Sequence, residues 1–390
     1  MSNAIYLDGF ATMPLAPEAR HLMMAVWEQP ANAGSPHRLG ERAASYVSAG
    51  RTAVADLIGA SPSEIYFTSG ATESNNLAIL GIARWAEQGG SDRRQVIVSS
   101  IEHKAVIEPA VFLREQGFDI VLAPVTQDGV VDTAALAELA SEQTLLISIM
   151  AANNETGTIQ PVKEVATIAR EIGALIHCDA AQAAGKVGID VIELDVDYMS
   201  LSAHKLYGPS GVGALYVSAT APSPVPQSLG GGQQNAIRPG TEPVALIAGF
   251  GAAAKVARDK LDEDTAHVGE MAVRFIQRLS AAGLAPEIVT GNRSVLPGSL
   301  SICVPGVDVE DLVLSVSERV AISTGSACTA GQVSQSHVLQ AMRIPEAKSR
   351  SIFRVMLNKY LTLEDIIDAA DIIAESARRI RDRTGRPRQW

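Results

Sequence analysis

Hydrophobic and polar residues follow two alternating patterns along most of the chain. Short apolar runs that end in polar or glycine-bearing stretches predict strands within 64–70, 95–100, 119–125, 144–154, 174–180 and 198–205. Between strands, residues 72–88 and 163–173 carry apolar positions at helical spacing. The alternation predicts an α/β fold in which helices cover both faces of a mostly parallel sheet. Ligand-binding residues are therefore expected in the loops that follow the strands.

The pattern changes in the last third of the chain. Residues 244–283 predict one or two long helices without an intervening strand, and shorter apolar runs then predict a smaller α+β unit. We expect a domain boundary near residue 255. The large domain would span 12–255, and the small domain would combine 1–11 with 256–390 and carry a loop at about 323–335.

Composition and charge narrow the class of protein. The 390 residues are 47% hydrophobic and 19% charged, as in a globular enzyme. The net charge of −11 gives no basic patch for nucleic acid. Three cysteines fit neither a disulfide framework nor a zinc site. With no signal peptide and no apolar stretch of membrane-spanning length, we expect a cytoplasmic protein without a nucleic-acid or membrane partner.

A lysine stands at the end of the last predicted strand. Lys205 follows Ser202 and His204 and precedes a Gly-Pro-Ser-Gly turn. Taken alone it reads as a solvated surface lysine. At a strand end, however, its amine can form a Schiff base with an aldehyde cofactor such as pyridoxal phosphate.

Other strand ends offer what pyridoxal phosphate requires. Asp179 can keep the pyridine nitrogen protonated, and Gln182 can bond the ring hydroxyl. Ala71 and Thr72 open a predicted helix whose N–H groups can bind the phosphate.

Two further strand ends carry polar residues that suit the same cofactor. His103 can stack on the ring, and Asn153 can bond the ring hydroxyl or the substrate. Each candidate also has an ordinary reading, as a helix cap, a surface histidine or a turn former. Those ordinary readings would all have to hold together at five successive strand ends.

One cysteine lies in an unusual setting. Cys328 sits within "STGSACTAG", where small polar residues and glycine leave too little apolar bulk to bury a thiol. Cys178 and Cys303 lie in apolar strand contexts instead, and we expect both to be buried core thiols.

Eight ordered motifs resemble the cysteine desulfurases, pyridoxal-phosphate enzymes of the class V aminotransferase group with fold type I. They are "TSGATESNN", "EHKAV", "ANNETGTIQP", "HCDAAQAAGK", "SAHKLYGPSGVG", "RPGTEPV", "STGSACTAG" and "SHVLQAM". The resemblance runs from residue 6 to about residue 363. It implies conversion of L-cysteine to L-alanine, with the sulfur passing to Cys328 as a persulfide.

The resemblance also assigns roles to individual residues. Lys205 would hold the cofactor covalently, Asp179 would pair with its ring nitrogen, and His103 would stack on the ring and move protons. The phosphate would be bound by Ala71, Thr72, Ser202, His204 and, from the partner subunit of a homodimer, Thr241. The substrate carboxylate would be bound by Arg354 and Asn32. No resident metal is expected, with Cys328 at most a transient iron–sulfur ligand.

Some positions depart from the family pattern, and other functions stay open. Gly9 and Phe10 replace the two asparagines that commonly stand near the substrate entrance. The sulfur acceptor is expected to be an iron–sulfur scaffold or a thiolation protein, and the pathway stays open. The alternatives are a selenocysteine lyase, an aminotransferase, or a non-catalytic sulfur-relay or scaffold subunit.

Overall fold

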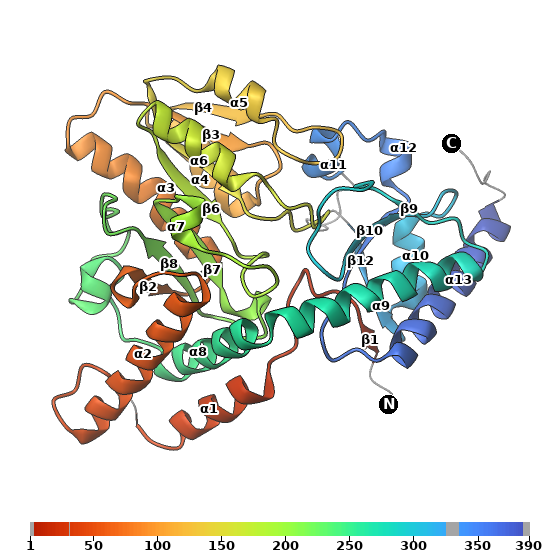
Figure 1. Cartoon of the computed structure of the whole chain (residues 1–390), viewed down its shortest axis with the longest axis horizontal. Helices are drawn as coiled ribbons and strands as arrows, with labels where there is room; N and C mark the ends of the chain where they lie inside the picture. The colour runs from red at the N-terminus through yellow and green to blue at the C-terminus, as the bar shows by residue number, and fades with distance from the viewer. Residues whose placement is uncertain (1–3, 31, 325–334, 385–390) are drawn as a thin grey trace.

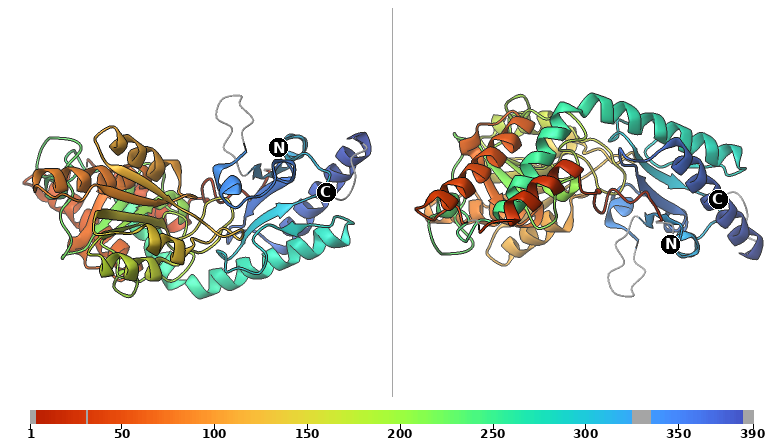
Figure 2. Two further views of the ribbon diagram at one scale, coloured as in Figure 1. Left: turned by 90° about the horizontal axis from the view of Figure 1, so that it is seen from above. Right: turned by 90° about the horizontal axis from the view of Figure 1, so that it is seen from below.

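The computed structural model describes residues 4–30, 32–324 and 335–384, which form two lobes (Figures 1 and 2). In the described chain, the larger lobe is built on a seven-stranded sheet of order β2-β8-β7-β6-β5-β3-β4. Its strands are β2 (Ile65–Thr68), β3 (Gln95–Ser99), β4 (Asp119–Ala123), β5 (Thr144–Met150), β6 (Leu175–Asp179), β7 (Tyr198–Ser202) and β8 (Gly213–Val217). Within this sheet, β3, β4, β5, β6 and β7 are parallel to one another. β8 runs antiparallel to its two neighbours, β2 and β7. The α/β prediction is confirmed, although β8 was not predicted.

Helices cover both faces of this sheet, because its strands are apolar on both sides. Ile97 of β3 belongs to the core on one face, whereas Val96 and Val98 belong to the core on the other. The second face is covered by α3 (Ala71–Gln88) and α4 (Lys104–Arg114). The first is covered mainly by α1 (Pro17–Trp27), α2 (Arg38–Leu57), α5 (Thr133–Leu139), α6 (Val162–Glu171), α7 (Val191–Leu194) and α8 (Val244–Asp259).

Two long helices connect the lobes. α8 ends at Asp259 and α9 (Leu261–Ala281) begins two residues later, so the prediction of one or two long helices over 244–283 is confirmed as two. Figure 2 shows α9 leaving the larger lobe and running along the smaller one. The expected domain boundary near residue 255 falls within α8, and the proposed division of the chain stays a prediction.

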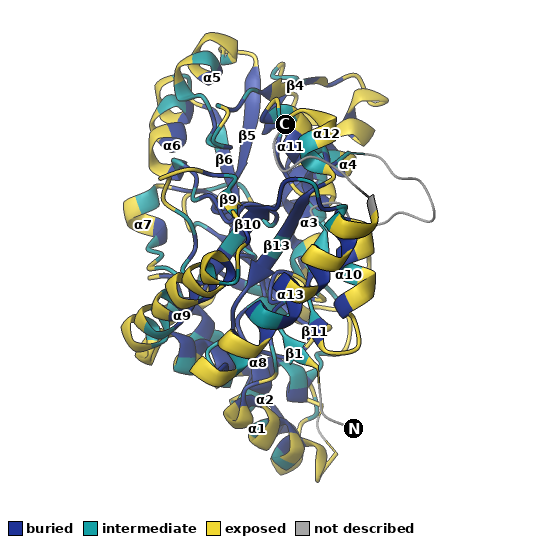
Figure 3. Cartoon of the chain, turned by 90° about the vertical axis from the view of Figure 1, so that its right-hand side faces the viewer, coloured by how far each residue is buried: buried dark blue, intermediate teal, exposed yellow. Residues whose placement is uncertain are grey.

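The smaller lobe packs helices against an antiparallel sheet of order β12-β13-β10-β9. Its strands are β9 (Glu287–Ile288), β10 (Ser299–Cys303), β12 (Ser323–Thr324) and β13 (Ile352–Met356), and a separate parallel pair joins β1 (Ile5–Tyr6) to β11 (Val320–Ala321). Its helices beyond α9 are α10 (Val309–Val316), α11 (His337–Ala341), α12 (Glu346–Ser349) and α13 (Leu363–Thr384). Phe275 of α9 and Phe353 of β13 lie in its core, while the outer faces of α9, α10 and α13 are exposed (Figure 3).

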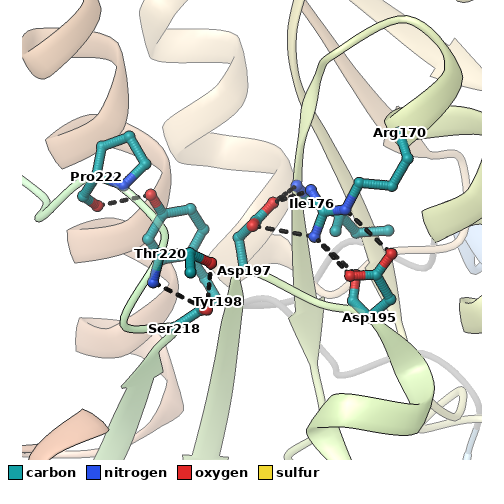
Figure 4. Close-up of polar contacts among 8 residues, drawn as sticks. All are labelled: Arg170, Ile176, Asp195, Asp197, Tyr198, Ser218, Thr220 and Pro222. Carbon is teal, nitrogen blue, oxygen red and sulfur yellow. Dashed lines mark hydrogen bonds and ion pairs between the residues drawn. The ribbon is translucent and has the colours of Figure 1, made fainter.

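An ion-pair cluster fixes the amino-terminal edge of the large sheet (Figure 4). Arg170 of α6 contacts both carboxylate oxygens of the buried Asp197, at 2.8 and 3.0 Å, and also pairs with Asp195. Asp197 in turn accepts the backbone N–H of Ile176 at 2.8 Å. These contacts tie α6 to the starts of β6 and β7, at the edge opposite the strand ends where chemistry was expected.

None of the helices in the described ranges is both long and apolar enough to cross a bilayer.

Candidate active site

A cavity of about 510 Å³ lies at the carboxyl ends of the large sheet. It brings together the predicted residues Ala71, Thr72, His103, Asp179, Gln182, Ser202, His204, Lys205 and Arg354. The first eight come from the larger lobe, and Arg354 comes from β13 of the smaller lobe. The topology explains this convergence, because parallel strands deliver the residues that follow them to one edge of the sheet.

One end of the cavity is formed by the start of α3. This helix begins at Ala71, directly after a Ser-Gly turn, and its first N–H groups have no partner within the helix. Glu73 accepts the backbone N–H of Ser69 at 2.6 Å and a hydrogen bond from Arg238 Nε at 2.9 Å. Gly213 of β8 lies so close that a Cβ atom there would be 2.6 Å from Gly70 Cα. The close approach fixes the turn, and the exposed N–H groups suit a phosphate.

Asp179, the last residue of β6, is oriented by two hydrogen bonds. Its Oδ1 accepts the N–H of Ala181 at 2.9 Å, and its Oδ2 accepts Asn75 Nδ2 at 2.7 Å. Sequence reasoning missed Asn75, although it stands within the quoted "TESNN". Its position on the first turns of α3 allows the start of this helix to hold the carboxylate in place.

A second carboxyl group is buried near Asp179. Glu102 is fully buried and accepts the N–H of Met150 at 2.5 Å. Burial, and then the charge of Asp179, raise the pKa of Glu102 well above its usual value. The fold therefore favours the protonated, uncharged form of Glu102 beside Asp179. No sequence signal distinguished it from an ordinary loop glutamate.

The Lys205 amine lies deep in the cavity. Its Nζ donates to the backbone carbonyl oxygens of Phe10 and Ala11, the latter at 2.9 Å. Burial, followed by the positive charge of Arg354, lowers the pKa of Lys205 to about 8. The lowered pKa increases the fraction of this lysine that is uncharged near neutral pH, which is the nucleophilic form of an amine.

His103 caps α4 through its ring. Nδ1 accepts the N–H of Ala105 at 3.1 Å, so the hydrogen of the neutral ring is on Nε2. Burial lowers the pKa of His103, although Asp179 acts in the opposite direction. His103 therefore lines the cavity with a flat, neutral imidazole that can donate a hydrogen bond from Nε2.

Arg354 closes the side of the cavity that faces the smaller lobe. Its Nε donates to Ser323 Oγ at 2.7 Å, and its Nη1 donates to the carbonyl oxygen of Asn154 at 3.1 Å. Asp8 lies 3.8 Å from Nη2, beyond hydrogen-bond distance. The remaining terminal N–H groups can therefore bind a carboxylate at two points.

Three of the predicted residues that the structure describes do not line the cavity, and a fourth cannot be placed. Asn153 is fully buried, with its amide engaged by Ile101, Glu155 and Thr156, so the structure places it as a turn former behind the wall. Asn32 and Thr241 are exposed on loops. Cys328 lies outside the described residues. The roles predicted for all four stay predictions.

The other two cysteines are buried, as predicted. Cys178 and Cys303 are both fully buried. Burial, with smaller effects of Asp179 and Glu102, raises the pKa of Cys178 well above its usual value. Its thiol therefore stays protonated and unreactive.

Two unpartnered polar atoms test whether pyridoxal phosphate fits. Gln182 Oε1 and Asn75 Oδ1 are buried at the cavity, and neither has a hydrogen-bond partner among the described residues. Buried acceptors of this kind usually have a partner, so both atoms suit a ligand with polar groups. With a lysine amine, a carboxylate and an open helix start beside them, the residues match the ring, aldehyde and phosphate of pyridoxal phosphate. Fold and site together define a fold-type-I enzyme that uses this cofactor.

Comparison with known proteins identifies the family. The family model for class V aminotransferases matches residues 5–368. A cysteine desulfurase IscS of Anaeromyxobacter sp. (strain Fw109-5) is 40% identical over 98% of this chain and 94% of its own length. The chain therefore belongs to the cysteine desulfurases, a pyridoxal-phosphate-dependent group of class V aminotransferases.

Solved structures agree with this assignment. A NifS-like protein superposes with a TM-score of 0.87 at 35% identity, covering 95% of this chain and 98% of its own. A structure described as SspA in complex with cysteine superposes with a TM-score of 0.79, also at 35% identity, covering 92% of this chain and 99% of its own. The fold expected from the sequence is thus shared with solved relatives over nearly the whole chain.

Proposed function

We propose that the protein converts L-cysteine to L-alanine and transfers the sulfur to Cys328 as a persulfide. The observation that carries the proposal is the environment of Lys205. Its amine, with a pKa lowered to about 8, opens into the same cavity as the carboxylate of Asp179 and the guanidinium of Arg354. A nucleophilic amine, a ring-nitrogen partner and a carboxylate receptor are what amino-acid chemistry on pyridoxal phosphate requires.

The cofactor would be held at its two ends by different elements. Its phosphate would lie at the start of α3, bound by Ala71, Thr72, Ser202 and His204, and its ring nitrogen would face Asp179. His103 would cover one ring face, and Gln182 would accept a hydrogen bond from the ring hydroxyl. When bound, pyridoxal phosphate supplies an electron sink for negative charge that develops on the substrate's α-carbon.

The chain's own side chains would orient the substrate and move its protons. Arg354 would bind the α-carboxylate, with Asn32 as a second contact. Lys205, released from the carbonyl oxygens of Phe10 and Ala11, would carry the α-proton. His103 would donate from Nε2 to a thiolate nearby. Accepting a proton at Nε2 would first require the ring to change tautomer and lose its bond to Ala105.

Sulfur transfer would be a displacement at the substrate's sulfur atom. The Cys328 thiolate would attack this sulfur, and an S–S bond would form as the C–S bond breaks with its electron pair moving to carbon. Protonation of that carbon then gives alanine and leaves the persulfide on Cys328. Its sequence neighbours are small and polar, which suits a thiol that would pass sulfur to a second protein.

The proposal extends to partners and location. We propose a homodimer in which Thr241 of each subunit completes the phosphate site of the other. The persulfide would pass to an acceptor protein, an iron–sulfur scaffold or a thiolation protein, in the cytoplasm.

The test is turnover of L-cysteine by purified protein in the presence of a thiol reductant. We expect alanine and sulfide in equal amounts, and the Cys328→Ala variant should retain the visible absorbance of the cofactor but release no sulfide. The matched control is Cys303→Ala, which removes a buried thiol and should leave turnover intact. Normal sulfide release by Cys328→Ala would refute the proposed sulfur step. Alanine formed without dependence on Cys328 would instead indicate another class V activity.

A further inference from the structure

Phe10 lies directly against the guanidinium of Arg354. Its side chain is buried, at 1% exposure, and belongs to the cavity wall. The Arg354 Cζ atom lies over the ring, 5.6 Å from its centroid. This distance is within the range of a cation–π contact, which strengthens when the pair is shielded from water.

Gly9 explains how the ring reaches this position. The N–H of Gly9 donates to the carbonyl oxygen of Met356 at 3.0 Å, and Asp8 forms a bridge to the same residue. A Cβ atom at position 9 would lie 2.7 Å from that oxygen and 2.8 Å from the Met13 methyl group, too close for any larger residue without movement. Because Arg354 stands two residues before Met356 on β13, this close approach brings Phe10 beneath it. Gly9 and Phe10 thus act as one structural unit.

The other contacts of Arg354 are two hydrogen bonds and an ion pair of 3.8 Å between Nη2 and Asp8. Ser323 and Asn154 accept hydrogen bonds in the plane of the group. Among the described residues, Phe10 is the only aromatic residue in cation–π contact with Arg354. In-plane bonds alone leave the group able to tilt about them, and the ring restricts that tilt.

We propose that Phe10 is a positioning residue that sets the affinity for the substrate's carboxylate through its cation–π contact with Arg354. The proposal rests on the proposed function, in which Arg354 receives that carboxylate. A two-point ion pair depends on the orientation of the guanidinium plane, so a small tilt weakens substrate binding. Phe10 therefore replaces a polar family residue with a support for the arginine.

The test compares two changes at position 10. Phe10→Leu removes the ring and keeps an apolar side chain. A difluorinated phenylalanine with an unsubstituted para position keeps the shape but weakens the negative ring face. Each change should raise the KM for L-cysteine, and the dissociation constant of L-alanine measured by cofactor absorbance, by about three- to thirtyfold, with kcat within about twofold.

A double-mutant comparison shows whether the ring acts through Arg354. In an Arg354→Gln background, Phe10→Leu should have no further effect on L-alanine binding. Equal weakening in both backgrounds would overturn the proposal, because the ring would then be only a wall of the cavity. The proposal also fails if Arg354→Gln weakens L-alanine binding whereas the difluorinated phenylalanine at position 10 leaves that binding unchanged. If Arg354→Gln itself leaves L-alanine binding unchanged, the carboxylate role in the proposed function fails instead.

Discussion

At the scale of single residues, the site depends on side chains that hold other side chains. Asn75 orients Asp179, and Phe10 lies beneath Arg354. Neither residue has a reactive group, yet each determines the orientation of a charge that the cofactor or substrate would meet. Such residues are sensitive targets, because the charged group they support lies in a cavity shielded from much of the solvent.

Replacing Asn75 should weaken cofactor binding. Asn75→Leu keeps the volume but removes the hydrogen bond to Asp179 Oδ2, which as a bond to a charged group is worth about 1.5–3 kcal/mol. We expect the apo-protein to bind pyridoxal phosphate about ten- to a hundredfold more weakly in a fluorescence titration. Its neighbour Asn76 is half-buried and, within the described chain, its side chain bonds to the backbone of Thr72 and not to Asp179, so Asn76→Leu is the matched control. Equal affinities for the two variants would contradict the role given to Asn75.

Sequence reasoning could find the reactive residues but not their supports. Lys205 and Asp179 were predicted because pyridoxal phosphate demands their chemistry at strand ends. Glu102 and Asn75 were missed, because an amide or a carboxyl becomes informative only when its burial and partners are known. Phe10 was noticed as a departure from a family pattern, but its contact with Arg354 depends on packing between the lobes. That packing has no local sequence signal.

At the scale of elements, α11 is held to the loop that follows β5 by the buried carboxyl group of Glu155. Ser336 caps the start of α11 and its Oγ lies 2.5 Å from Glu155 Oε2. Burial raises the pKa of Glu155 to about 7, while Ser336 and Arg354 act in the opposite direction. The fold therefore binds a proton at Glu155 more tightly than the unfolded chain does.

Glu155→Gln should change how stability depends on pH. The pKa of this glutamate is about 4.5 in the unfolded chain and about 7 in the fold. The free energy of unfolding therefore falls as the pH rises from about 4.5 to about 7, by about 3 kcal/mol in total. Glutamine cannot ionise and avoids this loss. Relative to the parent, the variant should gain thermal stability between about pH 5 and about pH 8. The exposed Glu138→Gln serves as control, and parallel pH profiles for parent and Glu155→Gln would contradict the prediction.

The ion pairs at the amino-terminal edge of the sheet should carry a larger share of stability than ordinary surface pairs. Arg170→Met leaves the buried Asp197 without its cation and should lower the free energy of unfolding by about 2 kcal/mol. The loss is not larger because Arg170 itself is partly exposed. Arg274→Met breaks an exposed pair with Glu270 on α9 and should cost about 0.5 kcal/mol or less. Denaturant unfolding of the two variants checks the difference. Similar losses would mean that the cluster in Figure 4 behaves as a surface feature.

Six of the seven strands described in the large sheet were predicted, and the exception, β8, has a local cause. Alternation of apolar runs was sufficient for the parallel strands, because each is buried on both faces and bounded by polar loops. β8 lies directly after the glycine-rich turn that follows Lys205, and its strand pattern was read as part of that motif. The pairing of Arg170 with Asp197, 27 residues apart, became visible only in three dimensions.

At the scale of the whole molecule, the site is assembled from two separate cores. One lobe contributes the strand ends, and the other contributes Arg354 from β13. Thr241 lies on an exposed loop and does not line the cavity of its own chain. This placement agrees with a homodimer in which each subunit supplies Thr241 to the other.

Mixing two inactive variants tests that assembly. Lys205→Ala removes the amine, and Thr241→Glu would place a negative charge beside the phosphate of the partner's site. Random reassociation should create hybrids with one intact site, and about a quarter of the parent's turnover should return. The control is each variant incubated alone, which should stay inactive. A mixture no more active than its components would contradict the shared site.

The separation between the two edges of the large sheet has a practical consequence for protein engineering. Residues that react gather at the carboxyl ends of the strands, whereas the Arg170 cluster secures their amino-terminal ends. Substitutions at the secured edge can therefore alter thermal tolerance while the catalytic edge keeps its geometry. A mutant library confined to Arg170 and its neighbours would vary thermal stability while leaving the catalytic residues unchanged.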